Sequence, residues 1–354
     1  MSKTLFVVLN KDNADGLMNV LRSLVNQDNT CKICECFDVL IIDGGSKDDS
    51  MRIANEFQSK YPCIRFKIQE VTGGVGPARL EAIKYALSNG YSYIIWGDSE
   101  NIYSKDYVAR ITSFPENCEI VSGKPIVLCS NIYEKLFFWY HAYHVLFSYV
   151  RKRHAPGNNK AVKVSTYSKS TYPPVIRSDD FYFSVIALKK NITFCYNDEA
   201  LVTVTLPNNW EGIKSWQRSR ILGSVQGALL LKKLLPPDFL PWFLFSTYPL
   251  YFIISSILML MSNPFGYLIM LLASAATLFM LFKLFKLSNE VCVRKCLTTP
   301  IAGFIGMYIH SLFTTYYTLK YLFRYIDRKS RENLINTSKE ILGKYGFKLD
   351  ESLN

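Results

Sequence analysis

The stretch "YSYIIWGDSEN", residues 91–101, is a short apolar run that ends in acidic residues. Residues 93–96 are apolar or aromatic and suit a buried β-strand, and Asp98 and Glu100 follow directly. Two carboxylates placed so closely at the end of a buried strand repel each other unless a positive or hydrogen-bonding partner lies between them. A cation or a set of hydroxyl groups is therefore expected there.

Strand-like and helix-like segments alternate on the N-terminal side of this stretch. Strands are expected at 4–9, 37–42, 64–69 and 91–96, and helices at 14–27, 47–59 and 77–88. This alternation predicts an α/β fold with a mainly parallel, Rossmann-like sheet. Ligands bind beyond the carboxyl ends of such strands, where Asp43 would join Asp98. A hard cation that bridges carboxylate and phosphate oxygens would suit this sheet edge.

Composition narrows the classes of protein. The chain has 354 residues, a net charge of +12, 49% hydrophobic residues and nine cysteines. The first 13 residues lack the long apolar run of a signal peptide, so the N-terminal region is expected to be cytosolic, with reduced cysteines. A metal site at "CKICEC" (31–36) is the less favoured alternative, because no second ligand pair follows it. Nucleic-acid binding is not expected, because membrane surfaces account for the positive charge.

A long uncharged segment predicts an integral membrane protein. No Asp, Glu, Lys or Arg occurs in the 44 residues from 239 to 282, enough for two spans near 240–261 and 265–283. Residues 296–319 are also uncharged, and a third span at 300–320 is favoured, which would leave the tail 321–354 outside the cell. The alternative is a third segment that lies in the interface or re-enters the membrane, which would leave the tail cytosolic. The basic segment between the second and third spans is expected to be cytosolic.

The expected organisation therefore has four parts. Residues 1–205 form the catalytic domain, 206–239 amphipathic interfacial helices, 240–320 a transmembrane region of two or three helices, and 321–354 a basic tail. Residues 131–153 combine aromatic side chains with the basic cluster "RKRH". They are expected to lie in the membrane interface, with a core helix of the catalytic domain as the alternative.

Several motifs together resemble a known family. They are "VVLNKDNADGLMNVLRSLVNQ", "VLIIDGGSKDDS", "GGVGPARLEAIKYA", "YIIWGDSEN", "GNNKAVK" (157–163), "SDDFYF" (178–183) and "WQRSR" (216–220). Their order and spacing resemble those of the family 2 glycosyltransferases, which are inverting enzymes of the GT-A fold that use nucleotide sugars. The resemblance covers roughly residues 4–225 and the membrane tail that follows.

The resemblance implies roles for matching residues on the donor side. Asp43 would accept a hydrogen bond from the base, and Arg79 would lie near the nucleotide. Asp98 and Glu100 would stand for the family's Asp-x-Asp motif and hold Mg²⁺ or Mn²⁺ on the diphosphate of a UDP- or GDP-sugar.

Further matches concern the acceptor side and the membrane. Asp180 would be the general base. Gln217, Arg218 and Arg220 resemble part of the Gln-x-x-Arg-Trp motif of membrane polysaccharide and glycolipid synthases, and the resemblance implies that they also help to bind the donor. A metal ion and an arginine would stabilise the leaving diphosphate, while one carboxylate deprotonates a hydroxyl of a lipid-linked or glycan acceptor.

The chain also departs from the family pattern. Glu100 replaces an Asp, Asp179 replaces the Glu of a Glu-Asp pair, and Ile221 stands where the motif has Trp. A polyprenyl-phosphate sugar synthase, which needs no general base, is an alternative enzyme, and a non-catalytic membrane-bound sugar-nucleotide-binding protein is a second. Structural roles are the alternative for single residues: Asp43 and the Asp179–Asp180 pair could cap helices, and Arg218 and Arg220 could be membrane-proximal cations.

Overall fold

A computed structural model describes residues 3–28, 30–113, 115, 117–231 and 248–349 of the chain. One eight-stranded sheet organises the N-terminal part, in the order β3-β2-β1-β4-β7-β6-β8-β5. The strands are β1 (Thr4–Asn10), β2 (Phe37–Asp43), β3 (Ile64–Ile68), β4 (Tyr93–Asp98), β5 (Asn101–Tyr103), β6 (Ile120–Ile126), β7 (Lys160–Lys163) and β8 (Phe194–Val204). The helices around the sheet are α1 (Ala14–Val25), α2 (Ser50–Lys60), α3 (Val75–Ser88), α4 (Tyr107–Thr112) and α7 (Asp179–Lys189).

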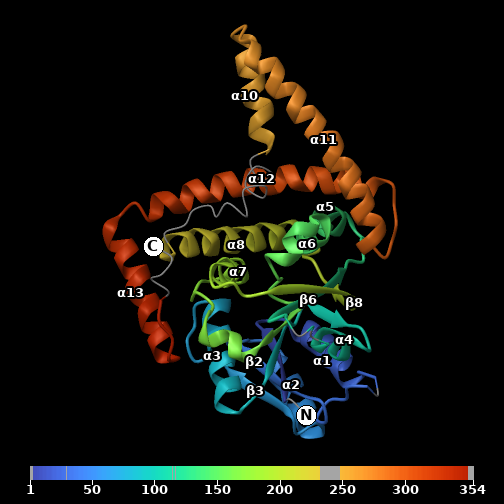
Figure 1. The fold of residues 1–354 in the computed structure, drawn as a ribbon, viewed down its shortest axis with the longest axis vertical. Coiled ribbons are helices and arrows are strands. Elements are labelled where there is room, and N and C mark those ends of the chain that lie inside the picture. Colours follow the sequence, from blue (N-terminus) through green and yellow to red (C-terminus); the bar gives the residue numbers. More distant parts are fainter. Residues whose placement is uncertain (1–2, 29, 114, 116, 232–247, 350–354) are drawn as a thin grey trace.

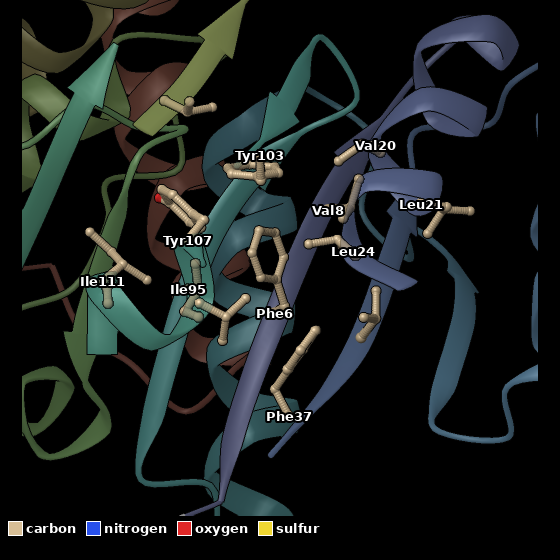
Figure 2. Close-up of a cluster of buried hydrophobic side chains, with 14 of the residues drawn as sticks. Phe6, Val8, Val20, Leu21, Leu24, Phe37, Ile95, Tyr103, Tyr107 and Ile111 are labelled. Carbon is tan, nitrogen blue, oxygen red and sulfur yellow. The ribbon is translucent and has the colours of Figure 1, made fainter. Parts of the chain in front are cut away.

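The four predicted strands pair in parallel, as expected. β1 pairs with β2 and with β4, and β2 pairs with β3. The side chains of β1, β2 and β4 are mostly buried on both faces because helices cover both sides, whereas the edge strand β3 is partly exposed. Figure 2 shows one of the two cores, where Phe6 and Ile95 from neighbouring strands meet Leu21 and Leu24 of α1. The carboxyl ends of β2 and β4 therefore share one edge of the sheet.

The second half of the sheet is mixed. β7 lies antiparallel between β4 and β6, whereas β6 and β8 are parallel. β5 pairs only with β8, in antiparallel register, with Asn101 opposite Val204. The chain thus leaves the parallel core after β4 and immediately enters the far edge of the sheet, so the loop between β4 and β5 lies where two parts of the fold meet.

The aromatic segment 131–153 belongs to the interior, which corrects the expected interfacial position. It forms α5 (Ile132–His141), α6 (Tyr143–Leu146) and the 3₁₀ helix η1 (Ser148–Lys152). Phe137, Phe138 and Trp139 are fully buried in a cluster that also includes residues of the C-terminal helices. The C-terminal helices therefore cover the apolar surface of this segment, which the composition predicted to face lipid.

Within the described residues, five helices follow the last strand of the sheet. α8 (Trp210–Leu230) lies between α7 and α12 (Thr298–Arg324), and α13 (Arg328–Lys344) descends along the side of the domain (Figure 1). The remaining two, α10 (Tyr248–Leu260) and α11 (Pro264–Val291), form a hairpin that projects away from the domain (Figure 1). The first part of the expected first span, 240–247, and residues 232–239 lie outside the described residues.

The position of α12 and α13 contradicts a third membrane crossing. α12 packs along α5 and α8, with Ala302 and Met307 buried against the catalytic domain. Beyond it, the predicted tail is helical, and Tyr345 packs with Leu80 of α3 and donates a hydrogen bond to Glu81 at 3.2 Å. The end of α13 therefore lies on the same side as the catalytic domain, which a crossing at 300–320 would not allow.

Only part of the expected membrane region has the length and composition of a span. Within the described ranges, Pro264–Val291 is the one helix long and apolar enough to cross a membrane. The 19 residues before Lys283 rise about 28 Å, close to the roughly 30 Å of a bilayer core. Large apolar side chains on the hairpin are exposed, including Leu260, Phe265 and Leu278.

The cysteines are paired, which contradicts the expectation of reduced thiols. Disulfides join Cys31 to Cys36, Cys34 to Cys63, Cys118 to Cys195 and Cys129 to Cys292. Cys296 alone is free and is exposed. The "CKICEC" cysteines are thereby used in disulfides rather than in a metal site. The Cys129–Cys292 bond joins the end of the catalytic sheet to the residue that follows α11.

Candidate active site

Asp98 is the last residue of β4, and Glu100 lies on the short loop that leads to β5. The side-chain nitrogen of Asn13, the N-cap of α1, donates to the backbone oxygen of Ser99 at 3.1 Å. The backbone nitrogen of Thr205 donates to the backbone oxygen of Glu100 at 3.0 Å. Both acidic side chains remain partly exposed. The backbone of the loop is thus fixed from two sides, while its carboxylates stay accessible to a ligand.

The electrostatics of this loop favour a cation. Burial raises the pKa of Asp98 to about 6; the charge of Arg79 opposes this rise and that of Glu100 adds to it. Among the described residues, no group of three or more His, Cys, Asp or Glu side chains could hold a metal alone. A Mg²⁺ or Mn²⁺ ion held by one or two carboxylates and by substrate phosphates needs no such group. Asp98 and Glu100 therefore fit an ion that arrives with a diphosphate.

Asp43 lies at the same sheet edge but is occupied by its own loop. Its Oδ1 accepts hydrogen bonds from the backbone nitrogens of Gly45 (2.9 Å) and Ser46 (2.7 Å). Its Oδ2 accepts from Asn10 Nδ2 (2.8 Å) and Ser46 Oγ (2.6 Å). A carboxylate has about four acceptor positions, so these donors fill it. Asp43 therefore has a structural role in the turn after β2. It does not cap α2, as the structural alternative proposed, because that helix begins only at Ser50.

Arg79 forms the buried ionic centre of the site. It pairs with Asp179, and both side chains are almost fully buried. Its guanidinium also lies over the rings of Trp96 (4.7 Å) and Tyr172 (5.1 Å). Burial opposes its charge, but Asp179 and the nearby acids keep the pKa of Arg79 above its usual range. The buried Nη1 has no hydrogen-bond partner, so Arg79 retains a donor for a ligand.

Two loops bring Arg79 and Asp179 together. The backbone nitrogens of Val75 and Gly76 donate to the oxygens of Ile176 and Val175, each at 3.0 Å. Gly74 has a φ of 120°, and a Cβ there would lie 2.4 Å from the Cα of Ile176. Only glycine permits both the conformation and the approach. The "GGVG" segment thus joins the start of α3 to the loop before α7.

Asp180 points into a different environment from its neighbour Asp179. Its Oδ2 accepts from the backbone nitrogen of Gly157 at 2.9 Å and lies 4.0 Å from His154 Nε2. Burial would raise the pKa of Asp180, but His154, Lys160 and other cationic groups lower it to about 2. Its side chain is 19% exposed. Asp180 is therefore an ionised carboxylate that remains open on one side, as a base for an incoming hydroxyl must be.

Lys160 is a functional candidate that the sequence analysis did not single out. It is fully buried in β7 opposite Trp96, donates to the backbone oxygen of Ala155 at 3.2 Å and lies over Tyr172 and Phe183. Burial, aided by Arg79, lowers the pKa of Lys160 to about 7. The sequence did contain a sign of this burial. Lys160 lies two residues before Val162, on the same inward-facing side of the strand, where an apolar residue is normally found.

The three residues of the arginine motif separate on α8. Gln217 is fully buried, and Arg220 is partly buried one turn later, whereas Arg218 is exposed. Arg220 lies over the rings of Tyr140 (5.0 Å) and Trp216 (4.8 Å), and it contributes to the low pKa of Asp180. The structure thus brings Gln217 and Arg220 to the site and leaves Arg218 outside it.

Trp216 supplies the aromatic surface that Ile221 lacks. Its ring is 4.7 Å from that of Tyr140 and stacks on His141 at 5.8 Å. Ile221 instead packs with Tyr321 and Tyr325 of the C-terminal helices. The substitution at the family's Trp position therefore serves helix packing, while the residue just before Gln217 carries the indole.

The charged side chains of the candidate site form one ionic cluster. The charges of Asp98, Asp179 and Asp180 all act on Arg79, and those of Lys160 and Arg220 act on Asp180. A separate cavity of about 510 Å³ lies near the C-terminal residues 342–349 and touches this cluster only through Tyr172. The candidate site is therefore the group of acids and cations at the sheet edge rather than that cavity.

Comparison with known proteins agrees with this geometry. Residues 6–167 match the sequence model of the family described as glycosyl transferase family 2. The chain is 29% identical over 127 residues to "Uncharacterized glycosyltransferase YfnE" of Bacillus subtilis, a match that covers 36% of this chain and 29% of that protein. The matched region thus spans less than a third of that relative.

One solved structure shares the fold. The mannosyltransferase PcManGT from Pyrobaculum calidifontis, in complex with GDP-Man and Mn²⁺, has a TM-score of 0.55 at 15% identity over 91% of this chain and 87% of its own. S. aureus TarS 1-349 with UDP-GlcNAc has a TM-score of 0.48 at 17% identity, over 66% and 68% of the two chains. The α/β sheet is thus of the GT-A type, and residues 6–167 are similar in sequence to the family 2 glycosyltransferases.

Proposed function

We propose that the protein transfers a sugar, with inversion, from a UDP- or GDP-sugar to a hydroxyl of a lipid-linked or glycan acceptor at a membrane. The observation that carries this proposal is the meeting of three groups at one sheet edge: the Asp98–Glu100 loop, the buried Arg79 and the ionised Asp180. Direct displacement at a sugar carbon needs groups that stabilise the leaving diphosphate and a base that deprotonates the acceptor. The Asp98–Glu100 loop and Arg79 would meet the first need, and Asp180 the second.

The donor is expected to bind through charge. Asp98 and Glu100 would hold a divalent ion, which when bound neutralises charge that develops on the leaving diphosphate. Arg79 would offer its unpartnered Nη1 to the same negative group, while Asp179 holds the guanidinium in place through the ion pair. Asp43 is expected to act through the shape of its loop, because its own acceptor positions are filled by Asn10, Gly45 and Ser46.

The acceptor is expected to meet Asp180. This side chain is ionised and partly exposed, and the backbone nitrogen of Gly157 fixes one of its oxygens. The acceptor hydroxyl becomes acidic as its new bond to the sugar forms, so a positioned carboxylate can take its proton. Trp216 and Tyr140 hold Arg220 near this carboxylate, because the guanidinium lies over both rings and its charge acts on Asp180.

The membrane side is proposed from exposed apolar surface. The hairpin of α10 and α11 presents large apolar side chains, and α12 carries a second exposed apolar face that runs along the helix. The members of that face are Ile301, Ile305, Leu312, Tyr316, Leu319 and Phe323. We place the hairpin in the bilayer and α12 along its surface, with the catalytic domain in the cytosol. Because α13 docks on α3, both ends of the hairpin would lie on the cytosolic side.

A panel of labelled nucleotide sugars tests the reaction. Membranes that contain the wild-type protein should release nucleoside diphosphate from one of them and move label into a lipid or polymer, and Asp180→Asn membranes should do so far more slowly. A product in which the sugar is joined to a lipid phosphate would identify the polyprenyl-phosphate alternative. Absence of transfer from every UDP- and GDP-sugar would contradict the proposal.

Cysteine labelling tests the topology. Asn333→Cys in α13 and Lys60→Cys in α2 are compared, each in a Cys296→Ser background, with an impermeant reagent on intact and permeabilised cells. Both positions should be labelled only after permeabilisation. Labelling of position 333 alone on intact cells would restore the third crossing.

A further inference from the structure

Two glycines let α12 approach α5 unusually closely. A Cβ on Gly306 would lie 1.8 Å from the backbone oxygen of Leu136, and one on Gly303 would lie 2.6 Å from the ring of Phe138. These glycines and His310 recur at the spacing of one helix face. The close approach therefore sets the depth at which the His310 side chain enters the protein, beneath the apolar outer face of α12.

The His310 ring is buried against the aromatic residues of α5 and points to the arginine motif. It is 3% exposed, and its ring centre lies 5.6 Å from that of Trp139 and 5.2 Å from that of Tyr140, both edge to face. Its Nδ1 is 2.9 Å from Oε1 of Gln217, and its Nε2 is 3.4 Å from the hydroxyl of Thr314.

The direction of these hydrogen bonds is determined by chemistry. An amide oxygen only accepts, so Nδ1 of His310 must carry the proton and donate it to Gln217. In the neutral ring Nε2 is then an acceptor, which the Thr314 hydroxyl satisfies. With its oxygen committed to His310, Gln217 has its Nε2 left as a donor. That nitrogen is buried and has no partner within the protein.

The unpartnered amide belongs to the catalytic site. Arg220 follows Gln217 at the i+3 position of α8, and its own buried Nε also lacks a partner. Tyr140 links His310 to Arg220, because the His310 ring packs edge to face with the Tyr140 ring while the Arg220 guanidinium lies over it. A ligand that satisfies both nitrogens must present oxygen acceptors, as a phosphate or a sugar hydroxyl does.

We infer that His310 is a positioning residue for transfer: it fixes the Gln217 amide with its N–H toward the ligand and so links α12 to the reaction centre. This inference rests on the proposed function. Without His310, the amide is free to turn its oxygen toward the ligand, which would replace an attraction by a repulsion.

Three substitutions at one position separate hydrogen bonding from packing. His310→Leu removes the donor. His310→Asn keeps a donor close to the Nδ1 position, whereas the longer His310→Gln moves it by one methylene. We expect kcat/KM to fall about tenfold in the Leu variant, the scale of one lost hydrogen bond, and to recover to within about threefold in the Asn variant but not in the Gln variant. Ser59→Ala, at an exposed position near the end of α2, is the control and should leave kcat/KM unchanged.

A double-mutant cycle shows whether His310 acts through Gln217. If it does, His310→Leu should change kcat/KM by less than about twofold in a Gln217→Leu background. Multiplying losses in the double variant, or equal activity of the Asn and Gln variants, would overturn the inference. Wild-type protein that transfers no sugar would instead contradict the proposed function. If the Leu variant fails to fold, the Asn and Gln variants still decide the question.

Discussion

Breaking the Arg79–Asp179 pair should destabilise the fold far more than breaking an exposed pair of the same chemistry. In Asp179→Asn the carboxylate becomes an amide of nearly equal size, so packing is retained and only the charge is lost. The two side chains of the native pair are 3% and 4% exposed. Arg79 would remain buried with its nearest anion removed and its Nη1 already without a partner.

The expected loss follows from that burial. Removing one partner of a buried ion pair costs about 3–5 kcal/mol, because the other charge stays desolvated. At about 2–4 °C per kcal/mol for a domain of this size, the melting temperature should fall by about 6–20 °C. The matched control is Glu199→Gln, which removes the partner of Arg110 where the side chains are 48% and 61% exposed. Solvent screens that pair, so its loss should leave the melting temperature essentially unchanged.

Thermal unfolding of both variants in the same detergent, followed by tryptophan fluorescence, measures the difference. Trp96 is a suitable reporter because its ring lies 4.7 Å from the Arg79 guanidinium. A nucleotide sugar should stabilise Asp179→Asn, since its diphosphate would supply an anion to Arg79. If Asp179→Asn and Glu199→Gln melt together, the ion pair does not hold α3 to α7 and the reasoning fails.

Four further results are expected. Asp180→Asn should bind donor but transfer at least about 10²-fold more slowly, and lost donor binding with normal transfer would reverse its assigned role. Although burial favours the neutral form of Asp180, neighbouring cations lower its pKa from 3.8 to about 2. The charged carboxylate therefore stabilises the folded protein fully above about pH 4, and this contribution is lost as the pH falls through about 2. Between about pH 4 and pH 2, the urea midpoint of the wild type should drop more than that of Asp180→Asn. Glu100→Gln should abolish metal-dependent turnover in a folded protein, whereas full activity, or activity insensitive to EDTA, would exclude a metal role. Thiol titration of unfolded, unreduced protein should find only Cys296, and nine reactive thiols would show that the cysteines are reduced.

Local patterns predicted the first half of the sheet well. The strand expected at 37–42 is β2, Phe37–Asp43, and the helix expected at 77–88 is α3, Val75–Ser88. These elements are encoded by runs and periodicities within a dozen residues. The ends of β2 and β4 then placed Asp43 and Asp98 at one edge, because parallel strands share their direction.

Non-local packing was not predictable in the same way. An aromatic helix such as α5 suits lipid or core equally well, and only the arrival of α12 decides which. The 24 uncharged residues from 296 to 319 are long enough to span a bilayer, yet Gly303 and Gly306 dock them onto α5. Lys160 was missed because a lysine usually signals surface, and its burial depends on the acids around it.

The antiparallel pairing of β5 with β8 also has a consequence for the order of events during synthesis. Residues 99–100 cannot be fixed until Val204, opposite Asn101, has left the ribosome, although β4 can join the N-terminal strands much earlier. The aromatic face of α5 stays uncovered for longer still, until α12 is made. By then the hairpin at 248–291 has already emerged. Nascent chains should therefore reach a membrane before their active site is complete. A chain whose membrane insertion is delayed would expose aggregation-prone aromatic surface to other chains.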